Sequence, residues 1–312
     1  MAKVLITGVS GFIGSSLARG LLAEGATVRG IDDMSTGKTA NLDEIRSKID
    51  FREASILDAA AIKDACAGVD YVFHEAAIPS VPVSVADPVG TNGPNLNGTL
   101  TVLEASRHAG VKRVLFAASS AAYGDAPELP KTEAMLPGPI SPYAVQKVAS
   151  EHYLASYTRV YGLETVSLRY FNIFGPRQDP TSQYSGVLAR FISQMSKGET
   201  PTIFGDGSTS RDFVYIDNVV SANLLAARTT APVAGRVFNI ATGKRTTLLE
   251  AYETIKSVLG YEGGVEFKPE RVGDIQHSLA DISLAKDVFG YKVVAEFREG
   301  LEKTIAWYLN GG

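Results

Sequence analysis

The sequence predicts an α/β fold in which a doubly wound parallel sheet carries a smaller, interleaved C-terminal α/β lobe. Three observations predict this fold. Short apolar runs rich in β-branched residues alternate with helical patterns along most of the chain. A glycine-punctuated turn joins the first run to the first helix. Polar side chains directly follow several runs, where the carboxyl ends of parallel strands form a ligand-binding edge.

The first turn of the chain is a candidate phosphate site. Residues 3–7 form a continuous apolar run that is too short for a helix, and a helical pattern starts near Phe12. Between them, Gly8 permits a tight turn, Gly11 lets the backbone approach a pyrophosphate, and Gly14 lets helix and strand pack closely. The N–H groups and the dipole at the helix start favour phosphate oxygens. This stretch therefore predicts dinucleotide binding.

Later elements follow the same alternation. Strands are expected where short aliphatic and aromatic runs end in polar residues or turns, at 26–32, 50–54, 70–74, 111–118, 163–169 and 237–241. Helices are expected over periodic apolar patterns, at 58–67, at 95–109, from Pro142, from Val219 and at 248–259. Residues 80–88 are proline-rich and predict a loop beside the substrate cleft, and residues 178–210 predict an excursion into the second lobe.

Composition argues against several classes of protein. The 312-residue chain has a net charge of −4 and no basic block, which argues against nucleic acid or an anionic membrane as its main partner. One cysteine, Cys66, allows no internal disulfide and indicates a reducing compartment, and we expect it to be a small buried apolar residue. No apolar run approaches the length of a membrane span, and the chain enters a strand rather than a signal peptide. We expect a cytoplasmic protein without a metal site.

Candidate nucleotide contacts lie beyond the first turn. Asp32 ends the second strand about 20 residues after the glycines, where a carboxylate accepts both adenosine ribose hydroxyls and favours NAD over NADP. Arg211 suits a pyrophosphate as a bidentate donor, although a surface ion pair with neighbouring Asp212 is an open alternative. Arg271 is a second candidate clamp for the diphosphate, and Asp274 is a candidate ligand of the nucleoside ribose.

Two segments carry candidate catalytic residues. The fifth strand runs into Ser119 and Ser120, at the edge where such sheets bind ligands. Tyr143 and Lys147 are four residues apart at a helix start and so share one face. A phenol has a pKa of about 10, which a nearby ammonium and a positive nicotinamide ring would lower. Tyr143 could then remove a hydroxyl proton while Lys147 holds the nicotinamide ribose and either serine hydrogen-bonds the reacting oxygen. We interpret His74 as a packed core residue.

Together these motifs resemble the extended short-chain dehydrogenase/reductases. Residues 7–14 match that superfamily's T-G-x-x-G-F-I-G pattern at every specified position. Within it, the chain is similar to UDP-galactose and UDP-N-acetylglucosamine 4-epimerases at Asp32 and in the segments 7–14, 95–99, 119–124, 143–147, 169–177, 203–207, 211–217 and 271–281. The resemblance implies a Rossmann domain with bound NAD. It also implies that C4 of the sugar is oxidised to a ketone, that the sugar rotates about its diphosphate link, and that hydride returns to the other face.

The resemblance also implies ligand contacts by position. The implied cofactor contacts are Gly8, Gly11, Phe12, Ile13, Asp32, Ser55, Ile56, Ala76, Ala77, Asn95, Tyr143, Lys147 and Tyr170. The implied substrate contacts are Ser80, Ser84, Ser119, Tyr143, Asn172, Val187, Ile203, Phe204, Arg211, Arg271, Asp274 and Ser278. Ser55 stands where the family usually has an aspartate that contacts adenine, so its hydroxyl must make that bond or the contact is lost.

Substrate choice depends on one position. In the family, the residue four after the aspartate of a Gly-Asp pair walls the sugar pocket, and a bulky tyrosine there excludes N-acetyl groups. Here that residue is Ser278, so we expect N-acetylhexosamines to be accepted beside glucose and galactose.

A dehydratase is disfavoured, because Ser120 and Ala121 replace its Asp-Glu pair. A UDP-glucuronate 4-epimerase or decarboxylase stays open, and a non-catalytic NAD-binding sensor is a remote alternative.

The chain is expected to form two interleaved domains and a homodimer. Residues 1–173 and 213–242 are expected to bind NAD, and residues 174–212 and 243–312 are expected to bind the UDP-sugar. The helices after Asn95 and Tyr143 carry more apolar residues than one face needs, namely Leu100, Leu103, Tyr153, Leu154 and Tyr157. We expect these residues to pair with a second copy through a four-helix bundle, with burial against the sheet as the alternative.

Overall fold

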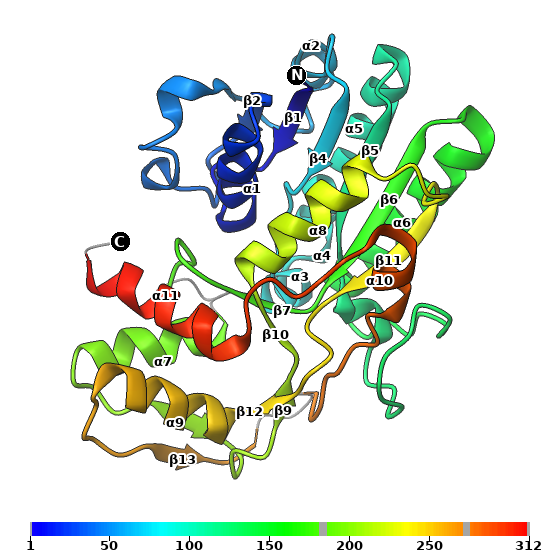
Figure 1. Ribbon diagram of the computed structural model, residues 1–312. Coiled ribbons are helices and arrows are strands. Elements are labelled where there is room, and N and C mark those ends of the chain that lie inside the picture. Colours follow the sequence, from blue (N-terminus) through cyan, green and yellow to red (C-terminus); the bar gives the residue numbers. More distant parts are fainter. Residues whose placement is uncertain (1, 181–185, 271–274, 311–312) are drawn as a thin grey trace.

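Parallel strands form the central sheet. We describe them from a computed structural model, which covers residues 2–180, 186–270 and 275–310. Within these residues the sheet has seven strands: β1 (Lys3–Thr7), β2 (Thr27–Asp32), β3 (Asp50–Glu53), β4 (Tyr71–His74), β5 (Arg113–Ser119), β6 (Glu164–Tyr170) and β11 (Arg236–Ile240). Their spatial order is β11-β6-β5-β4-β1-β2-β3, which confirms the doubly wound arrangement (Figure 1).

The carboxyl ends of all seven strands meet at one edge of the sheet, because every neighbouring pair is parallel. Strand β1 pairs with β2 on one side and with β4 on the other, so the chain order reverses between β1 and β4. Doubly wound sheets bind their ligands in the crevice at this reversal. Side chains that follow β1, β2, β4, β5 and β6 are therefore placed around one site.

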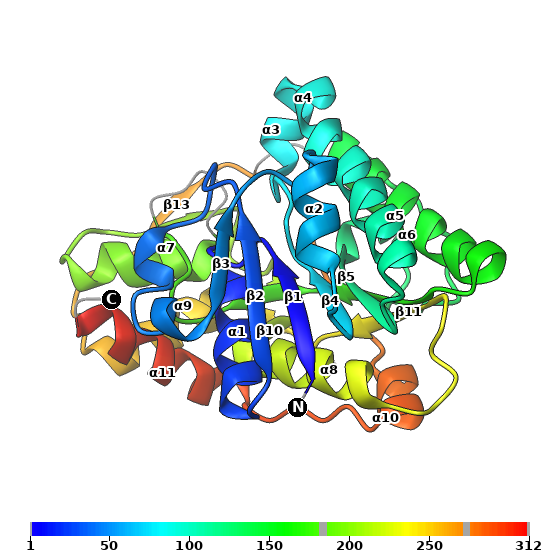
Figure 2. The same cartoon turned by 90° about the horizontal axis from the view of Figure 1, so that it is seen from above.

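Helices cover both faces of the sheet. On one face lie α2 (Ala59–Cys66), α5 (Gly98–Ala109) and α6 (Pro142–Tyr161), and on the other lie α1 (Phe12–Ala23) and α8 (Ile216–Arg228) (Figure 2). Successive strand residues point to opposite faces, so Leu5 and Ile6 enter different core layers. Cys66 is buried in the α2 layer, which confirms its expected apolar role. No helix in the described residues is long and apolar enough to cross a membrane.

The prediction of a loop over residues 80–88 is wrong. The segment contains α3 (Val81–Ala86) and α4 (Pro88–Asn92), and a π-helical turn (Gly93–Asn97) leads from there into α5. The side chains of Ser80 and Asp87 cap the two helices by accepting hydrogen bonds from first-turn N–H groups. Proline is tolerated in a first helical turn, where its missing N–H would have no intrahelical partner. The prolines here therefore sit at helix starts.

A smaller lobe lies beside the sheet (Figure 1, lower left). It contains α7 (Val187–Ser196), β8 (Thr202–Phe204), β9 (Ser210–Arg211), β12 (Thr246–Thr247), α9 (Leu248–Leu259), β13 (Glu266–Lys268) and α11 (Phe297–Leu309). The chain enters the lobe after β7 (Asn172–Phe174) and returns through β10 (Phe213–Tyr215), and these two strands pair. Helix α10 (Ser283–Phe289) packs on β11, so the C-terminal part contacts both parts of the molecule.

Three residues expected at a subunit interface belong to the protein's own core. Leu103, Leu154 and Tyr157 are buried in the layer between the sheet and helices α5 and α6. Leu100 is partly buried against the same layer, whereas Tyr153 is 41% exposed. An apolar helical position looks the same in the sequence whether a sheet or a second copy covers it, and for these three residues the sheet covers it.

We predict that Gly14→Ala destabilises the protein. A Cβ at Gly14 would lie 2.1 Å from the Gly8 carbonyl oxygen, and this neighbour is backbone that cannot rotate away. Overpacking of this kind costs about 1–3 kcal/mol, which urea denaturation would measure as a lower midpoint. Gly264→Ala is the matched control, because no atom of the described residues lies within 4 Å of its added Cβ. Equal stability of the two variants would contradict the close contact between helix and strand.

Candidate active site

Three of the four candidate catalytic residues come together at the carboxyl edge of the sheet. Ser119 ends β5, and Tyr143 and Lys147 lie on successive turns at the start of α6. The Lys147 ammonium donates a hydrogen bond to the Ala117 carbonyl oxygen (2.8 Å) and lies 5.9 Å from the centre of the Tyr143 ring. Its side chain is almost completely buried, with the Phe116 ring 4.7 Å away on its other side. The predicted Tyr–Lys pair therefore faces the sheet.

Ser119, rather than Ser120, faces the phenol of Tyr143. Burial raises the pKa of Tyr143, and a side-chain hydrogen bond with Ser119 partly opposes this rise. The Ser119 hydroxyl also accepts a hydrogen bond from the Ala121 N–H (3.2 Å), which closes the turn after the strand. Ser120 begins the short 3-10 turn that follows. The geometry thus favours Ser119 where the sequence left both serines open.

Several side chains fix the start of α6. Ser141 caps the helix by accepting a hydrogen bond from the Ala144 N–H, and the Ser84 hydroxyl accepts one from the Tyr143 N–H (3.0 Å). Gln146 is bonded to the side-chain amide of Asn95 (2.8 Å). The Asn95 amide also bonds both backbone groups of Ile78. Asn95 and Ser84, predicted as ligand contacts, are thus buried residues that hold helix α6 in place in this structure, and their ligand contacts stay predictions.

A buried ion pair anchors the same helix further along. Glu151 lies one turn beyond Lys147, and its carboxylate accepts two hydrogen bonds from Arg169 of β6 (2.9 and 2.7 Å). The Arg169 guanidinium lies 4.6 Å from the Tyr123 ring centre, and the Tyr123 hydroxyl donates to Asn239 of β11 (2.6 Å). Sequence reasoning missed this chain of contacts. The one signal in the sequence was the four-residue spacing from Lys147 to Glu151, because this spacing places both side chains on one face of the helix.

The turn after β1 fits a dinucleotide. Gly8 has a φ of +70°, and a Cβ there would lie 2.8 Å from the Ala76 backbone. Among the described residues, a Cβ at Gly11 would meet only the Gly8 oxygen within 4 Å, so a ligand can approach that backbone closely. Gly11 offers α1 no side-chain cap, which leaves the first-turn N–H groups, including those of Phe12 and Ile13, for a phosphate. The Asp32 carboxylate accepts from the Ser10 N–H (2.8 Å) beside this turn.

Other predicted cofactor contacts surround this turn. The Ala76 N–H donates to the Thr7 hydroxyl (3.2 Å), which places the 76–77 segment against the end of β1. Ile56 is buried beyond β3, and the Ser55 hydroxyl accepts from the Leu57 N–H (3.2 Å). No described residues form a group of three or more His, Cys, Asp or Glu side chains suited to a metal.

His74 is structural, as predicted. Its two ring nitrogens lie 2.7 Å from the Thr7 hydroxyl and 3.0 Å from the Thr99 hydroxyl. Complete burial, reinforced by the charge of Lys147, lowers the pKa of His74 to about 3. The imidazole is therefore neutral near pH 7, and both of its nitrogens are engaged in holding β4 to β1 and α5.

Glu75 is a site residue that the sequence analysis did not select. It follows β4, and its Oε1 accepts a hydrogen bond from the Tyr170 hydroxyl (3.1 Å), which in turn accepts one from the Asn223 amide (2.8 Å). Its Oε2 is buried without a hydrogen-bond partner among the described residues. A glutamate at the end of a buried strand, directly at the ligand-binding edge, was the signal that could have identified it.

The lobe brings several predicted substrate contacts together. Arg211 lies in β9, and its guanidinium donates to the Gln276 carbonyl oxygen (3.2 Å). The Ser278 N–H donates to the Ser210 carbonyl oxygen (3.0 Å), so Ser278 lies beside Arg211. Asn172 joins this group, because its N–H donates to the Asp212 carbonyl oxygen (3.2 Å). Arg271 and Asp274, the other predicted contacts here, lie outside the described residues.

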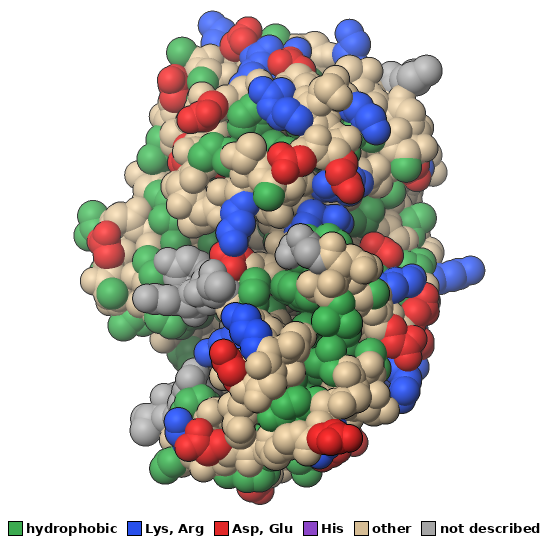
Figure 3. All heavy atoms as spheres, turned by 90° about the vertical axis from the view of Figure 1, so that its left-hand side faces the viewer, with side chains coloured by type: hydrophobic (Ala, Val, Ile, Leu, Met, Phe, Trp, Pro, Cys, Tyr) green, Lys and Arg blue, Asp and Glu red, His purple; other side chains and the backbone are tan. Residues whose placement is uncertain are grey.

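Asp212 does not serve as the ion-pair partner that the alternative for Arg211 required. Its carboxylate is fully buried and accepts hydrogen bonds from the N–H and hydroxyl of Thr242 and from the N–H groups of Gly243 and Ala280. It therefore ties three lobe segments together. Of the remaining predicted contacts, Ile203 is buried in β8, and Phe204 and Val187 are half-buried. Lys and Arg side chains flank the boundary between sheet and lobe in Figure 3.

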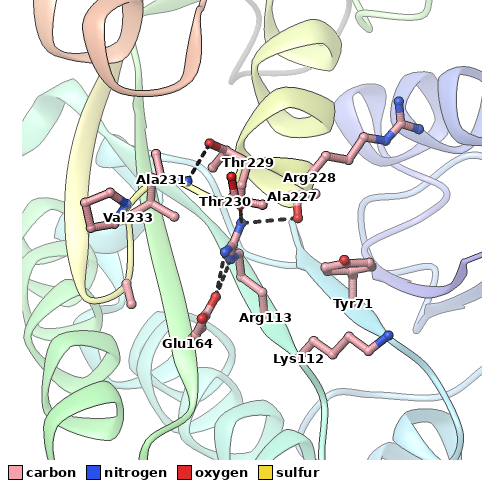
Figure 4. Close-up of a pocket in the computed structure, with 12 residues that line it drawn as sticks. Tyr71, Lys112, Arg113, Glu164, Ala227, Arg228, Thr229, Thr230, Ala231 and Val233 are labelled. Atoms are coloured by element: carbon pink, nitrogen blue, oxygen red, sulfur yellow. Dashed lines mark hydrogen bonds and ion pairs between the residues drawn. The ribbon is translucent and has the colours of Figure 1, made fainter.

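A cavity of about 400 Å³ lies at the opposite edge of the sheet, between the start of β5 and the end of α8 (Figure 4). Arg113 lies in its wall and donates to the Glu164 carboxylate (2.6 and 2.8 Å). The same guanidinium donates to backbone oxygens at the end of α8, including that of Ala226. This cavity is distant from Tyr143 along the strands, and its charged wall joins the sheet to α8.

Comparison with known proteins agrees with this geometry. The model of the NAD dependent epimerase/dehydratase family matches residues 4–241. The chain is 39% identical to a UDP-glucose 4-epimerase of Mycolicibacterium smegmatis, with 99% of each chain covered. It is 40% identical to the structure of UDP-N-acetylglucosamine 4-epimerase from Methanobrevibacter ruminantium M1 in complex with UDP-N-acetylmuramic acid, with a TM-score of 0.95 and coverage of 100% and 99%.

A second similar structure contains a UDP-sugar and NAD together. It is UDP-glucuronic acid 4-epimerase from Bacillus cereus in complex with UDP-glucuronic acid and NAD, 32% identical, with a TM-score of 0.90 and coverage of 99% and 100%. The match of the family model over most of the chain and the identity to full-length relatives agree with the fold, the glycine turn and the Tyr–Lys pair. The chain therefore belongs to the NAD-dependent epimerase/dehydratase family.

Proposed function

We propose that the protein epimerises a UDP-hexose at C4 through a transient 4-keto sugar. The observation that carries this proposal is the convergence of Ser119, Tyr143 and Lys147 at the carboxyl edge of the sheet. NAD, the cofactor of this family, supplies the group that accepts and returns a hydride. The three relatives described above are each named as 4-epimerases.

Tyr143 would serve as the base for the hydroxyl on C4. Burial disfavours its phenolate, so the phenol needs a compensating positive charge to lose its proton near neutral pH. The buried ammonium of Lys147 supplies that charge. Ser119 would hydrogen-bond the reacting oxygen while the proton moves between this oxygen and Tyr143. The same phenol could return the proton when the ketone is reduced.

We assign the two ligands to the two predicted domains. Residues 1–173 and 213–242 would hold NAD, with Asp32 on the adenosine ribose and the first-turn N–H groups of α1 on the pyrophosphate. Residues 174–212 and 243–312 would hold the UDP-sugar, with Arg211 on its diphosphate. Asn172, at the end of the first NAD-binding range, would donate to the same diphosphate, because its backbone is bonded to that of Asp212 beside Arg211. Rotation of the sugar requires that the nucleotide is bound firmly and the hexose loosely. Side chains that bind only the diphosphate meet this requirement, because they make no contact with the hexose.

For the sugar, we propose that N-acetylhexosamines are accepted beside glucose and galactose. Ser278 is small and lies next to Arg211 in the lobe, which leaves room that a tyrosine would fill. The Methanobrevibacter relative, named as a UDP-N-acetylglucosamine 4-epimerase, supports this choice. The Bacillus relative supports a UDP-glucuronate 4-epimerase as the second candidate.

The reducing compartment indicated by a single buried cysteine leads us to propose a cytoplasmic location.

We predict that Tyr143→Phe lowers kcat by about 10²–10⁴-fold, because the variant keeps the ring and loses the acid-base group. The assay would follow UDP-glucose and UDP-galactose interconversion by NMR, with bound NAD checked by absorbance after denaturation. Tyr161→Phe, an exposed tyrosine at the far end of the same helix, is the matched control and should keep full activity. A natural protein that binds NAD and turns over no UDP-hexose would instead indicate a sensor.

We predict that Ser278→Tyr selectively removes activity on UDP-N-acetylglucosamine. The added ring would occupy the space for the N-acetyl group, and steric discrimination of this kind is worth roughly 10- to 200-fold in kcat/KM. Activity on UDP-glucose is the internal control and should change little. A panel that includes UDP-glucuronate would identify the preferred sugar, and no turnover of UDP-N-acetylglucosamine by the unmodified protein would refute the pocket argument.

We propose a homodimer that pairs through the exposed apolar face of α6. Val145, Tyr153 and Val160 are 51%, 41% and 66% exposed, and their spacing of eight and seven residues places them on one face of the helix. A mass measurement by light scattering should give twice the mass of the chain. Val160→Glu should shift the population to monomers, and a monomer in the unmodified protein would contradict the proposal.

A further inference from the structure

Within the described residues, the Glu75 carboxylate at the end of β4 has one hydrogen-bonding partner, the neutral Tyr170 hydroxyl. The Glu75 N–H donates to the Thr7 carbonyl oxygen (3.2 Å), which fixes its backbone beside the reversal between β1 and β4. Its Oε1 is held by the Tyr170 hydroxyl, and its Oε2 has no hydrogen-bond partner in the described part of the chain. Burial of an unpaired carboxylate oxygen is costly. A charge that lies close by is therefore the expected compensation.

Lys147 is the charged group placed there. His74 pairs with Phe116 across β4 and β5, so Glu75 comes beside Ala117, whose carbonyl oxygen accepts the hydrogen bond of the Lys147 ammonium (2.8 Å). The titratable groups that act on Glu75 are Tyr170 from β6 and Lys147 from α6, while Asn223 from α8 contacts it only through Tyr170. His74 precedes Glu75 but points to the opposite face, where Thr7 and Thr99 hold it. Burial raises the pKa of Glu75 to about 7, and burial lowers the pKa of Lys147 to about 8. Each group favours the charged form of the other.

Glu75 differs from the second carboxylate near Lys147. Glu151 also favours the Lys147 ammonium, but to a smaller extent. Its own charge is neutralised by the two hydrogen bonds from Arg169. A carboxylate paired to a guanidinium produces a weaker field at a third site than a single charge does. Among the described residues, Glu75 is therefore the carboxylate whose charge acts on Lys147 without a cationic partner of its own.

We propose that Glu75 is a positioning residue that keeps the Lys147 ammonium charged and thereby assists proton removal by Tyr143. This inference rests on the role proposed above for Tyr143 and Lys147. Glu75 need not touch the substrate. Its carboxylate acts through Lys147, and its bond to Tyr170 sets its direction. Because burial brings both ionisations close to neutral pH, the effect should appear inside the working range of the protein.

The sign of the pH dependence follows from the two pKa values. Below about pH 6, Glu75 is protonated and Lys147 is charged with or without it. Above about pH 7 the carboxylate forms and helps Lys147 to stay charged. Glu75→Gln keeps the size of the side chain and an oxygen that can accept from Tyr170, but it removes the charge. In this variant Lys147 should lose its proton at lower pH.

We predict that Glu75→Gln lowers the pKa of Lys147 from about 8 to about 7 or below. NMR of lysine labelled at Cε in the NAD-loaded protein would measure this, with the Lys147 signal assigned by Lys147→Arg. In the unmodified protein the same signal should show a second inflection near pH 7, where Glu75 ionises. The alkaline limb of kcat should move down by about one pH unit, so that kcat falls about fivefold at pH 8 and is unchanged at pH 6, with KM unaltered.

Glu253→Gln, the same substitution on the exposed face of α9, is the matched control and should leave the titration and the pH profile unchanged. Unchanged titration of Lys147 in Glu75→Gln would reduce Glu75 to a hydrogen-bond acceptor and overturn the proposal, as would a single inflection in the unmodified protein. The titration requires no turnover. A failure of the proposed function in the Tyr143→Phe experiment would therefore remain distinguishable from a failure of this inference.

Discussion

The burial of the Lys147 ammonium is the constraint on which the rest of the site depends. A buried charge is tolerated only when it is hydrogen-bonded and faces compensating charge. Here the Ala117 carbonyl oxygen accepts its hydrogen bond, the Phe116 ring lies over it, and Glu75 and Glu151 supply negative charge. The lysine can lie there only if helix α6 is held tightly against the ends of β5 and β6. The geometry of the candidate catalytic residues therefore follows from the way this helix is held.

Buried polar contacts, rather than apolar packing alone, hold the helix. Gln146 and Glu151 project from α6 and are each bonded to side chains of other elements, Asn95 and Arg169 respectively. Such groups are costly when unsatisfied, so each pairing selects one position of the helix among those that apolar packing would allow. In the lobe, Asp212 has the same function, because its carboxylate joins segments that are distant in the sequence. Both parts of the proposed site are thus positioned by fully bonded buried carboxylates.

The fold was largely predictable, because its signals are local. The strands ending near Thr7, Asp32, His74 and Ser119 were expected within a few residues, and the helix start at Pro142 was correct. Errors arose where the same local signal has two outcomes. Prolines in residues 80–88 predicted a loop, yet they lie in the first turns of α3 and α4. In a first turn, proline sacrifices no intrahelical hydrogen bond. Apolar positions on α5 and α6 predicted a partner chain, yet the sheet covers Leu103, Leu154 and Tyr157.

By itself, the sequence determined the glycine turn after the first strand and the shared helical face of Tyr143 and Lys147, because covalent geometry and the helical repeat dictate both within a few residues. Only the tertiary structure decided that Ser119 rather than Ser120 meets the phenol, that Glu151 pairs with Arg169, and that Glu75 acts on Lys147. These outcomes depend on burial and on charges brought from separate strands and helices. Desolvation and Coulomb interactions act through space, so the separation of two residues in the sequence does not indicate whether they interact in this way.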